Sequence, residues 1–154
     1  MKKIIMIVTV PVVLETWLKG QPGFLSRYYD VEIITSDSDT IKQIQKYEGV
    51  SIKVMDISRQ INLFKDIKVL VLLYFYLLKS KPFMVYTLTP KAGLLGMISS
   101  WIARIPHRIH NIVGLPHLEA IGKRRIVLEI TERITYLFSS KLYCNSLNLN
   151  NLYQ

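Results

Sequence analysis

Residues 87–96, with the sequence TLTPKAGLLG, join an apolar run to the start of a predicted helix. Thr89 stands where an N-cap residue is expected and Pro90 at the first helical position. The free N–H groups of a helix start attract anions, and Lys91 adds a full positive charge there. Gly93 permits close contact with a sheet or a ligand. The pattern fits a phosphate or sugar-phosphate site, and it fits equally a capped helix that packs on the sheet.

Three histidines fall within residues 107–117, HRIHNIVGLPH. His107 and His110 are an odd number of positions apart, so on a strand they point to opposite faces. His117 follows a Gly-Leu-Pro turn. We therefore expect no metal site here. A histidine near the end of this strand, such as His110, is a candidate to bind an acceptor hydroxyl or phosphate, and a structural histidine is the alternative interpretation.

Lys and Arg number 20 against 11 Asp and Glu, a net charge of +9 that favours an anionic partner. The cations do not alternate with aromatics as in RNA-binding modules, and no DNA-reading motif is present, so we expect no nucleic-acid partner. Arg59, just after a predicted strand, is a further candidate to bind an anion. Other cations are expected to face an anionic membrane, with a solvated surface as the alternative. These are Lys65, Lys68, Lys79, Lys81, Lys123, Arg124 and Arg125.

Several signatures are missing from the sequence. It has no GxxxxGK[ST] phosphate loop, no GxGxxG dinucleotide fingerprint, no HExxH zinc motif and no GxSxG nucleophile elbow. The single cysteine, Cys144, excludes an internal disulfide and a cysteine-based zinc cluster, and it fits a reducing cytoplasm.

The elements that must position these residues alternate along the chain. Strands are predicted at residues 4–10, 31–35, 51–57, 83–87, 108–113 and 141–144, and helices at 15–28, 40–47, 63–79, 90–104 and 121–138. Alternating strands and helices predict one α/β domain, a Rossmann-like doubly wound parallel sheet. Ligands of such sheets bind beyond the carboxyl ends of the strands.

Two helices have a predicted buried face. For residues 63–79 it consists of Leu63, Ile67, Leu70, Tyr74 and Leu77; for residues 121–138 it consists of Val127, Ile130, Ile134 and Leu137. Glu129 and Arg133 form an i, i+4 pair on the exposed side of the second helix. The apolar run 69–78 is about half the length that spans a bilayer, so we expect it to lie on a membrane surface.

Five segments in order, VTVP, DISRQINLFKDIKVL, TPKAGLLG, PHRIHNIVGLP and LYCNSLNLNNL, resemble family 4 glycosyltransferases of the bacterial capsule, O-antigen and exopolysaccharide group. The resemblance covers nearly the whole chain. It implies that residues 1–154 are the N-terminal, acceptor-binding half of a two-domain GT-B architecture. The C-terminal half, which binds the nucleotide-sugar donor and carries an E-x7-E element, is then expected to be absent from this chain.

The resemblance also implies which molecules the chain binds and where in the cell it acts. The acceptor is a lipid-diphosphate-linked sugar at the inner face of the cytoplasmic membrane, no metal is required, and the nucleotide-sugar binds only with a C-terminal partner domain. The chain is then a glycosyltransferase that is inactive alone, either truncated or one half of a split enzyme, and its catalytic residues are unassigned. The alternative is a non-catalytic α/β interaction protein at the membrane surface. The candidate acceptor-binding residues are Arg59, Thr89, Lys91, Gly93, Arg108, His110 and Gly114.

Overall fold

The computed structural model describes residues 1–60, 62–113 and 120–144. Its centre is a six-stranded sheet of order β3-β2-β1-β4-β5-β6, and every neighbouring pair of strands is parallel. The predicted α/β, doubly wound parallel sheet is confirmed. The strands are β1 (Lys3–Ile7), β2 (Asp30–Thr35), β3 (Ser51–Val54), β4 (Met84–Thr87), β5 (His107–Ile112) and β6 (Lys141–Cys144).

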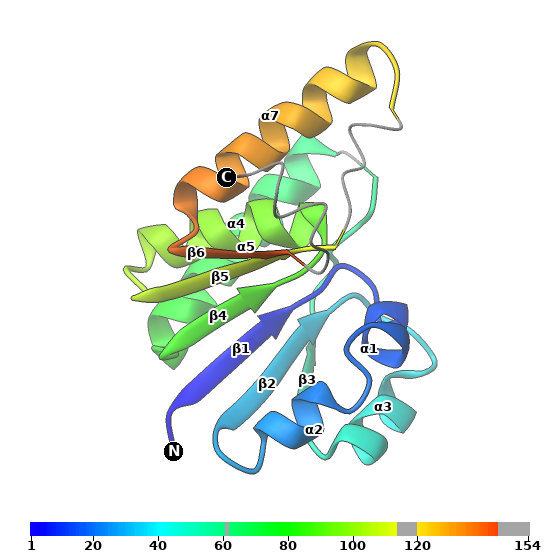
Figure 1. The fold of residues 1–154 in the computed structure, drawn as a ribbon, viewed down its shortest axis with the longest axis vertical. Coiled ribbons are helices and arrows are strands. Elements are labelled where there is room, and N and C mark those ends of the chain that lie inside the picture. The colour runs from blue at the N-terminus through cyan, green and yellow to red at the C-terminus, as the bar shows by residue number, and fades with distance from the viewer. Residues whose placement is uncertain (61, 114–119, 145–154) are drawn as a thin grey trace.

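Helices cover both faces of this sheet (Figure 1). One layer contains α1 (Val12–Thr16), α2 (Gln21–Leu25) and α3 (Ile41–Glu48), and the other contains α4 (Leu63–Ser80), α5 (Pro90–Ile102) and α7 (Lys123–Phe138). The change of side follows from the order of the strands. The chain builds outward from β1 to β3, crosses back to β4 beside β1 and then builds outward in the opposite direction, and right-handed crossovers place the later helices on the other face.

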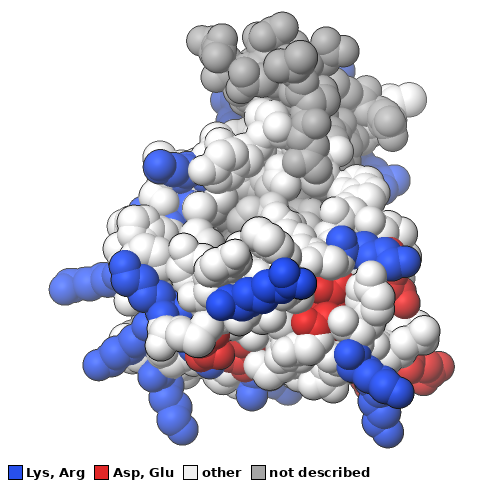
Figure 2. All heavy atoms as spheres, turned by 60° about the horizontal axis from the view of Figure 1, so that its bottom comes forward, with Lys and Arg blue, Asp and Glu red and all other residues white. Residues whose placement is uncertain are grey.

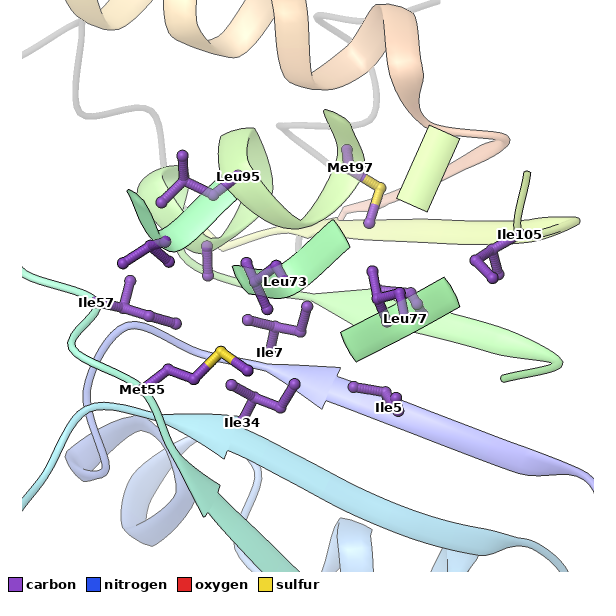
Figure 3. Packing of buried hydrophobic residues seen from close by; sticks show 13 residues of the cluster. Ile5, Ile7, Ile34, Met55, Ile57, Leu73, Leu77, Leu95, Met97 and Ile105 are labelled. Atoms are coloured by element: carbon purple, nitrogen blue, oxygen red, sulfur yellow. The ribbon is translucent and has the colours of Figure 1, made fainter. Parts of the chain in front are cut away.

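Alternate residues of β1 supply two separate cores. Ile4 and Met6 pack toward α1 and α3, whereas Ile5 and Ile7 pack toward α4 and α5. Figure 3 shows the second core, in which Leu73 and Leu77 of α4 lie over Ile5 and Ile7. A strand covered on both faces reads as a continuous apolar run, which explains IIMIV at the start of the chain.

The helix predicted at residues 15–28 is wrong in its bounds. The structure has two five-residue helices there, α1 and α2, separated at Gly20, which has a left-handed φ of 79°. The carboxylate of Glu48 accepts hydrogen bonds from the backbone N–H groups of Gly20 at 2.7 Å and Gly23 at 2.9 Å. A buried acid at the end of α3 therefore fixes the break.

The predicted buried face of α4 is also largely wrong. The buried residues are Val69, Leu73 and Leu77, while Leu63 and Ile67 are exposed. An 18-residue helix is about 27 Å long, whereas strands of four to six residues reach only about 13–20 Å. The first turns of α4 therefore extend past the sheet, where no strand covers them.

In α7 the expected apolar face lies largely on the outside. Val127, Ile130 and Leu137 are exposed, and the buried residues are Glu132 and Thr135. The outer position of Arg133, paired with Glu129 at 2.8 Å, is confirmed. The inner side of α7 is polar because it packs against the first turns of α5 and against His110, where small and hydrogen-bonding side chains fit.

Candidate functional site

The strand order reverses between β1 and β4, so the loops after these strands diverge. Open α/β sheets bind ligands at such a point. Thr9 follows β1 and Thr89 follows β4. The Thr9 N–H donates to Thr89 Oγ1 at 3.1 Å, and the two hydroxyl oxygens lie 2.6 Å apart. This pair ties the two diverging loops together.

The pairing corrects one prediction. Thr89 has the extended backbone of an N-cap residue (ψ 151°), but its side chain does not cap α5. Its hydroxyl is engaged by Thr9 instead. The Thr89 hydroxyl therefore accepts no hydrogen bond from the N–H groups at the start of α5, although the Gly93 N–H donates to the Thr89 carbonyl at 2.7 Å.

A first pocket of about 390 Å³ opens beside this pair, between α1 and α7. Its apolar lining includes Trp17, which is more than half exposed. Tyr136 OH donates to Glu132 Oε2 at 3.4 Å on the α7 side. Several lining side chains carry hydrogen-bonding groups, as hydroxyl-rich ligands require. They are Thr16, Arg59, Thr89, His110, Glu132 and Tyr136.

His110 is one of the buried polar residues that line the first pocket. It is 4% exposed, and its Nδ1 lies 2.8 Å from Thr87 Oγ1. Burial lowers the pKa of His110 to about 4, because a charged imidazolium would lose its hydration there. The ring is therefore neutral at pH 7. It can exchange hydrogen bonds with a hydroxyl group, but it supplies no positive charge to a phosphate.

Gly93 belongs to the packing behind the pocket. A Cβ at this position would lie 2.6 Å from His110 Cε1 and 3.0 Å from Thr135 Cγ2. The absence of a side chain lets α5 approach β5 and α7 closely enough to enclose the imidazole. The predicted close contact is therefore with the sheet and a neighbouring helix.

A second pocket of about 430 Å³ lies on the other side of Thr89 and Pro90. Leu94 of α5 and Val127 and Leu128 of α7 line it, and Arg124 stands at its edge. It also contains Lys91, whose Nζ lies 2.7 Å from Asp66 Oδ1 and donates to the carbonyl of Gln60. The charge of Lys91 is thus already neutralised by an acid in the first turn of α4.

Arg59 is the cation common to both pockets. It is exposed, and within residues 1–60, 62–113 and 120–144 the structure records no ion pair for it. Arg124 lines the second pocket and is likewise exposed. Of the cations predicted to bind an anion, Arg59 is therefore the best placed.

Arg108 does not belong to this site, which corrects its assignment. It is the second residue of β5 and lies near the amino end, away from the loops that form the pockets. Its guanidinium donates to the carbonyl of Ile105 at 2.6 Å and to that of Phe138, the last residue of α7, at 2.8 Å. Arginine satisfies such helix-end carbonyls, so the role of Arg108 is structural. Gly114 lies outside the described residues.

Sequence reasoning missed Thr9, Asp66 and Glu132. Thr9 lay inside the strand predicted at residues 4–10, whereas β1 ends at Ile7 and Thr9 belongs to the loop after it, where ligands of such sheets bind. Asp66 stands in the first turn of a helix, where an acid is usual and carries no special meaning. Glu132 lies on α7, on the side of the helix opposite to the predicted apolar face. Its place in the pocket depends on which side of α7 faces inward, and the sequence predicted the opposite side.

The cations predicted to face a membrane are all exposed, on α4, just after it, or at the start of α7. The outer surface of α4 also exposes apolar side chains, and Phe64 is 88% exposed. Among the described residues, no helix combines the length and apolar character needed to span a bilayer. In the view of Figure 2, Lys and Arg project from the left, lower and right parts of the described surface without forming one patch. Exposed apolar residues of α4 are Leu63, Phe64, Ile67, Val71, Leu72, Phe75 and Leu78.

Comparison with known proteins gives two relatives. Over 134 residues the chain is 35% identical to the capsular polysaccharide biosynthesis glycosyltransferase CapM of Staphylococcus aureus, covering 86% of this chain and 34% of CapM. Over 86 residues it is 31% identical to the UDP-Gal:α-D-GlcNAc-diphosphoundecaprenol α-1,3-galactosyltransferase of Escherichia coli, covering 56% of this chain and 22% of that enzyme. The chain thus spans about a third or less of these curated relatives. No protein-family model matches it.

Solved structures share the fold. UDP-GlcNAc 2-epimerase of Methanocaldococcus jannaschii superposes with a TM-score of 0.68 at 22% identity, covering 99% of this chain and 43% of that one. MurG of Acinetobacter baumannii superposes with a TM-score of 0.66 at 12% identity, covering 94% and 41%. At these identities the likeness concerns the fold alone. In both cases this chain covers less than half of the solved protein.

Proposed function

We propose that this chain, which is a GT-B glycosyltransferase domain of the polysaccharide-synthesis type, binds the lipid-linked sugar acceptor of such an enzyme. The observation that carries the proposal is the pair of pockets that share Arg59 and Thr89 at the point where the strand order reverses. The name of the E. coli relative supplies the ligand class, a sugar joined through diphosphate to undecaprenol.

Electrostatics favour the shared wall of the pockets as the place of the diphosphate. Arg59 and Arg124 are exposed cations for which the described part of the chain offers no recorded acidic partner, and a diphosphate would satisfy them. His110 is neutral and Lys91 is paired with Asp66, so neither adds net charge. The sugar then reaches the hydrogen-bonding groups of the first pocket.

The reaction of the whole enzyme is the transfer of a sugar from a nucleotide-sugar to this acceptor in cell-surface polysaccharide synthesis. Because the chain spans about a third of CapM, we assign donor binding to a further domain, in the same enzyme or in a separate chain. By itself the chain is expected to bind acceptor and to transfer nothing. Mixing this chain with the donor-binding domain of a relative and assaying sugar transfer tests whether acceptor binding and donor binding belong to separate domains.

Replacement of Arg59 by alanine is expected to weaken binding of GlcNAc-diphosphogeraniol, a short-chain acceptor analogue, about tenfold, because a charge-assisted contact to the diphosphate is lost. Titration calorimetry on the full chain measures this change. Arg133→Ala is the matched control, since Arg133 is exposed on α7 and paired with Glu129. Equal weakening by both variants, or none by Arg59→Ala, would contradict the proposal.

The outer face of α4 is proposed to rest on the inner surface of the cytoplasmic membrane. Exposed aromatics on this helix can enter the lipid boundary while Lys65, Lys68 and Lys79 meet anionic headgroups. The first turn of α4 also carries Asp66, which lines the second pocket, so this surface adjoins the proposed acceptor site.

The double variant Phe64→Asp/Phe75→Asp is expected to reduce co-sedimentation with phosphatidylglycerol vesicles at least about tenfold, because two exposed rings that would enter the lipid are replaced by negative charges that the anionic headgroups repel. Binding of the unaltered chain should fall as salt rises. Phe24→Asp, an exposed phenylalanine in the opposite helix layer, is the control and should bind normally. Unchanged sedimentation of the double variant would rule out α4 as the contact.

A further inference from the structure

We infer that the two pockets divide the acceptor between them: the first holds the sugar, and the second holds the part of the polyprenyl chain nearest the diphosphate. This inference rests on the proposed function and adds an orientation of the ligand. Arg59, Thr89 and Pro90 line both pockets, so a diphosphate at this wall extends naturally in two directions.

Both linings mix polar and apolar groups, since the first pocket also contains Trp17 and Ile112 and the second also contains the Lys91–Asp66 ion pair, but the side chains beyond the shared wall differ. Beyond the shared wall, the first pocket presents His110, Glu132 and Tyr136, whose hydrogen-bonding groups suit sugar hydroxyls. The second pocket presents Leu94, Val127 and Leu128, which suit hydrocarbon. Arg124 also lines the second pocket and is exposed, so the pocket assigned to the lipid supplies a second cation.

The exposed apolar side chains of α7 also support a prenyl chain that extends from the diphosphate through the second pocket. Val127 lines the second pocket and is 41% exposed, and Ile126 and Ile130 beside it are 58% and 51% exposed. None of these three side chains belongs to the two hydrophobic cores of the described residues. A prenyl chain leaving the second pocket would cover them and remove apolar surface from water.

The test compares GlcNAc-diphosphogeraniol with GlcNAc-diphosphomethanol by calorimetry, without detergent or lipid. Two isoprene units in place of a methyl group are expected to raise affinity at least about tenfold for the unaltered chain, since several CH₂ groups are buried. Val127→Asn should remove most of that gain. Leu137→Asn, which alters an exposed leucine of α7 outside the pocket, should keep it.

The outcomes separate the two proposals. If both ligands bind with equal affinity, the prenyl subsite is wrong while acceptor binding stands. If the geranyl ligand gains affinity equally in the Val127 and Leu137 variants, the chain lies elsewhere and the inference is wrong. If neither diphosphate sugar binds the unaltered chain, the proposed function itself fails. Circular dichroism of both variants verifies that each is folded.

Discussion

Between pH 7 and pH 4 the protein is expected to lose about 3 kcal/mol of its free energy of unfolding through one side chain, His110. Burial lowers the pKa of His110 from 6.5 to about 4 in the folded state. The unfolded chain therefore takes up a proton on this ring first. The contribution of the His110 side chain to the free energy of unfolding is complete above pH 6.5, declines as the pH falls toward 4 and is lost below pH 4.

Urea unfolding at several pH values measures the effect. Carboxyl groups titrate in the same range, so the quantity to compare is the pH dependence of the unaltered chain minus that of His110→Gln, which cannot take up the proton. The variant is expected to be less stable at pH 7 but to lose about 3 kcal/mol less on acidification. Parallel stability curves for the two proteins would show that His110 is not buried in its neutral form.

Replacement of Gly93 by alanine is expected to cost about 2–3 kcal/mol of unfolding free energy, or roughly 4–12 °C in Tm. The new Cβ would meet His110 Cε1 at 2.6 Å and His110 Nδ1 at 2.9 Å, and moving the ring away would break the hydrogen bond between Nδ1 and the Thr87 hydroxyl. Thermal unfolding followed by circular dichroism measures the change.

Two comparisons isolate the cause of that loss. Gly20→Ala meets no atom within 4 Å and strains only a backbone with a φ of 79°, so it should cost about 1 kcal/mol. The double variant Gly93→Ala/His110→Ala should be less destabilised than the sum of the single changes, because the clashing ring is gone. A Gly93→Ala protein as stable as the unaltered chain would mean that α5 does not approach β5 this closely.

Much of the fold could be predicted because burial on two faces and alternation of elements leave strong signals. The continuous apolar run at Ile4–Ile7 and the proline at the first helical position, Pro90, were enough to predict their elements from sequence alone. The inner sides of α4 and α7 could not be predicted. Both helices expose apolar residues as well as burying them, so periodicity does not distinguish the side facing the core from the other.

The site was predicted in part for similar reasons. Arg59, Thr89 and His110 lie at the carboxyl ends of parallel strands, and topology brings such residues together. Arg108 was misplaced because it was assigned from the family resemblance alone; it lies at the amino end both of the predicted strand 108–113 and of β5. Lys91 and Asp66 lie on two helices that are distant in the sequence, and neither residue by itself predicts that the two side chains form an ion pair.

The most direct test of the central claim, acceptor binding at the reversal of strand order, is an NMR titration of the full chain with GlcNAc-diphosphogeraniol. We expect saturable shifts of the backbone amide signals of Thr9, Arg59 and Thr89, with those of Arg108 and Arg27 unchanged. Thr9 and Thr89 are tied to each other at the shared wall of the pockets, so one ligand should move both. Saturable shifts confined to Arg108 and the amino ends of the strands, or no shifts at all, would contradict the central claim.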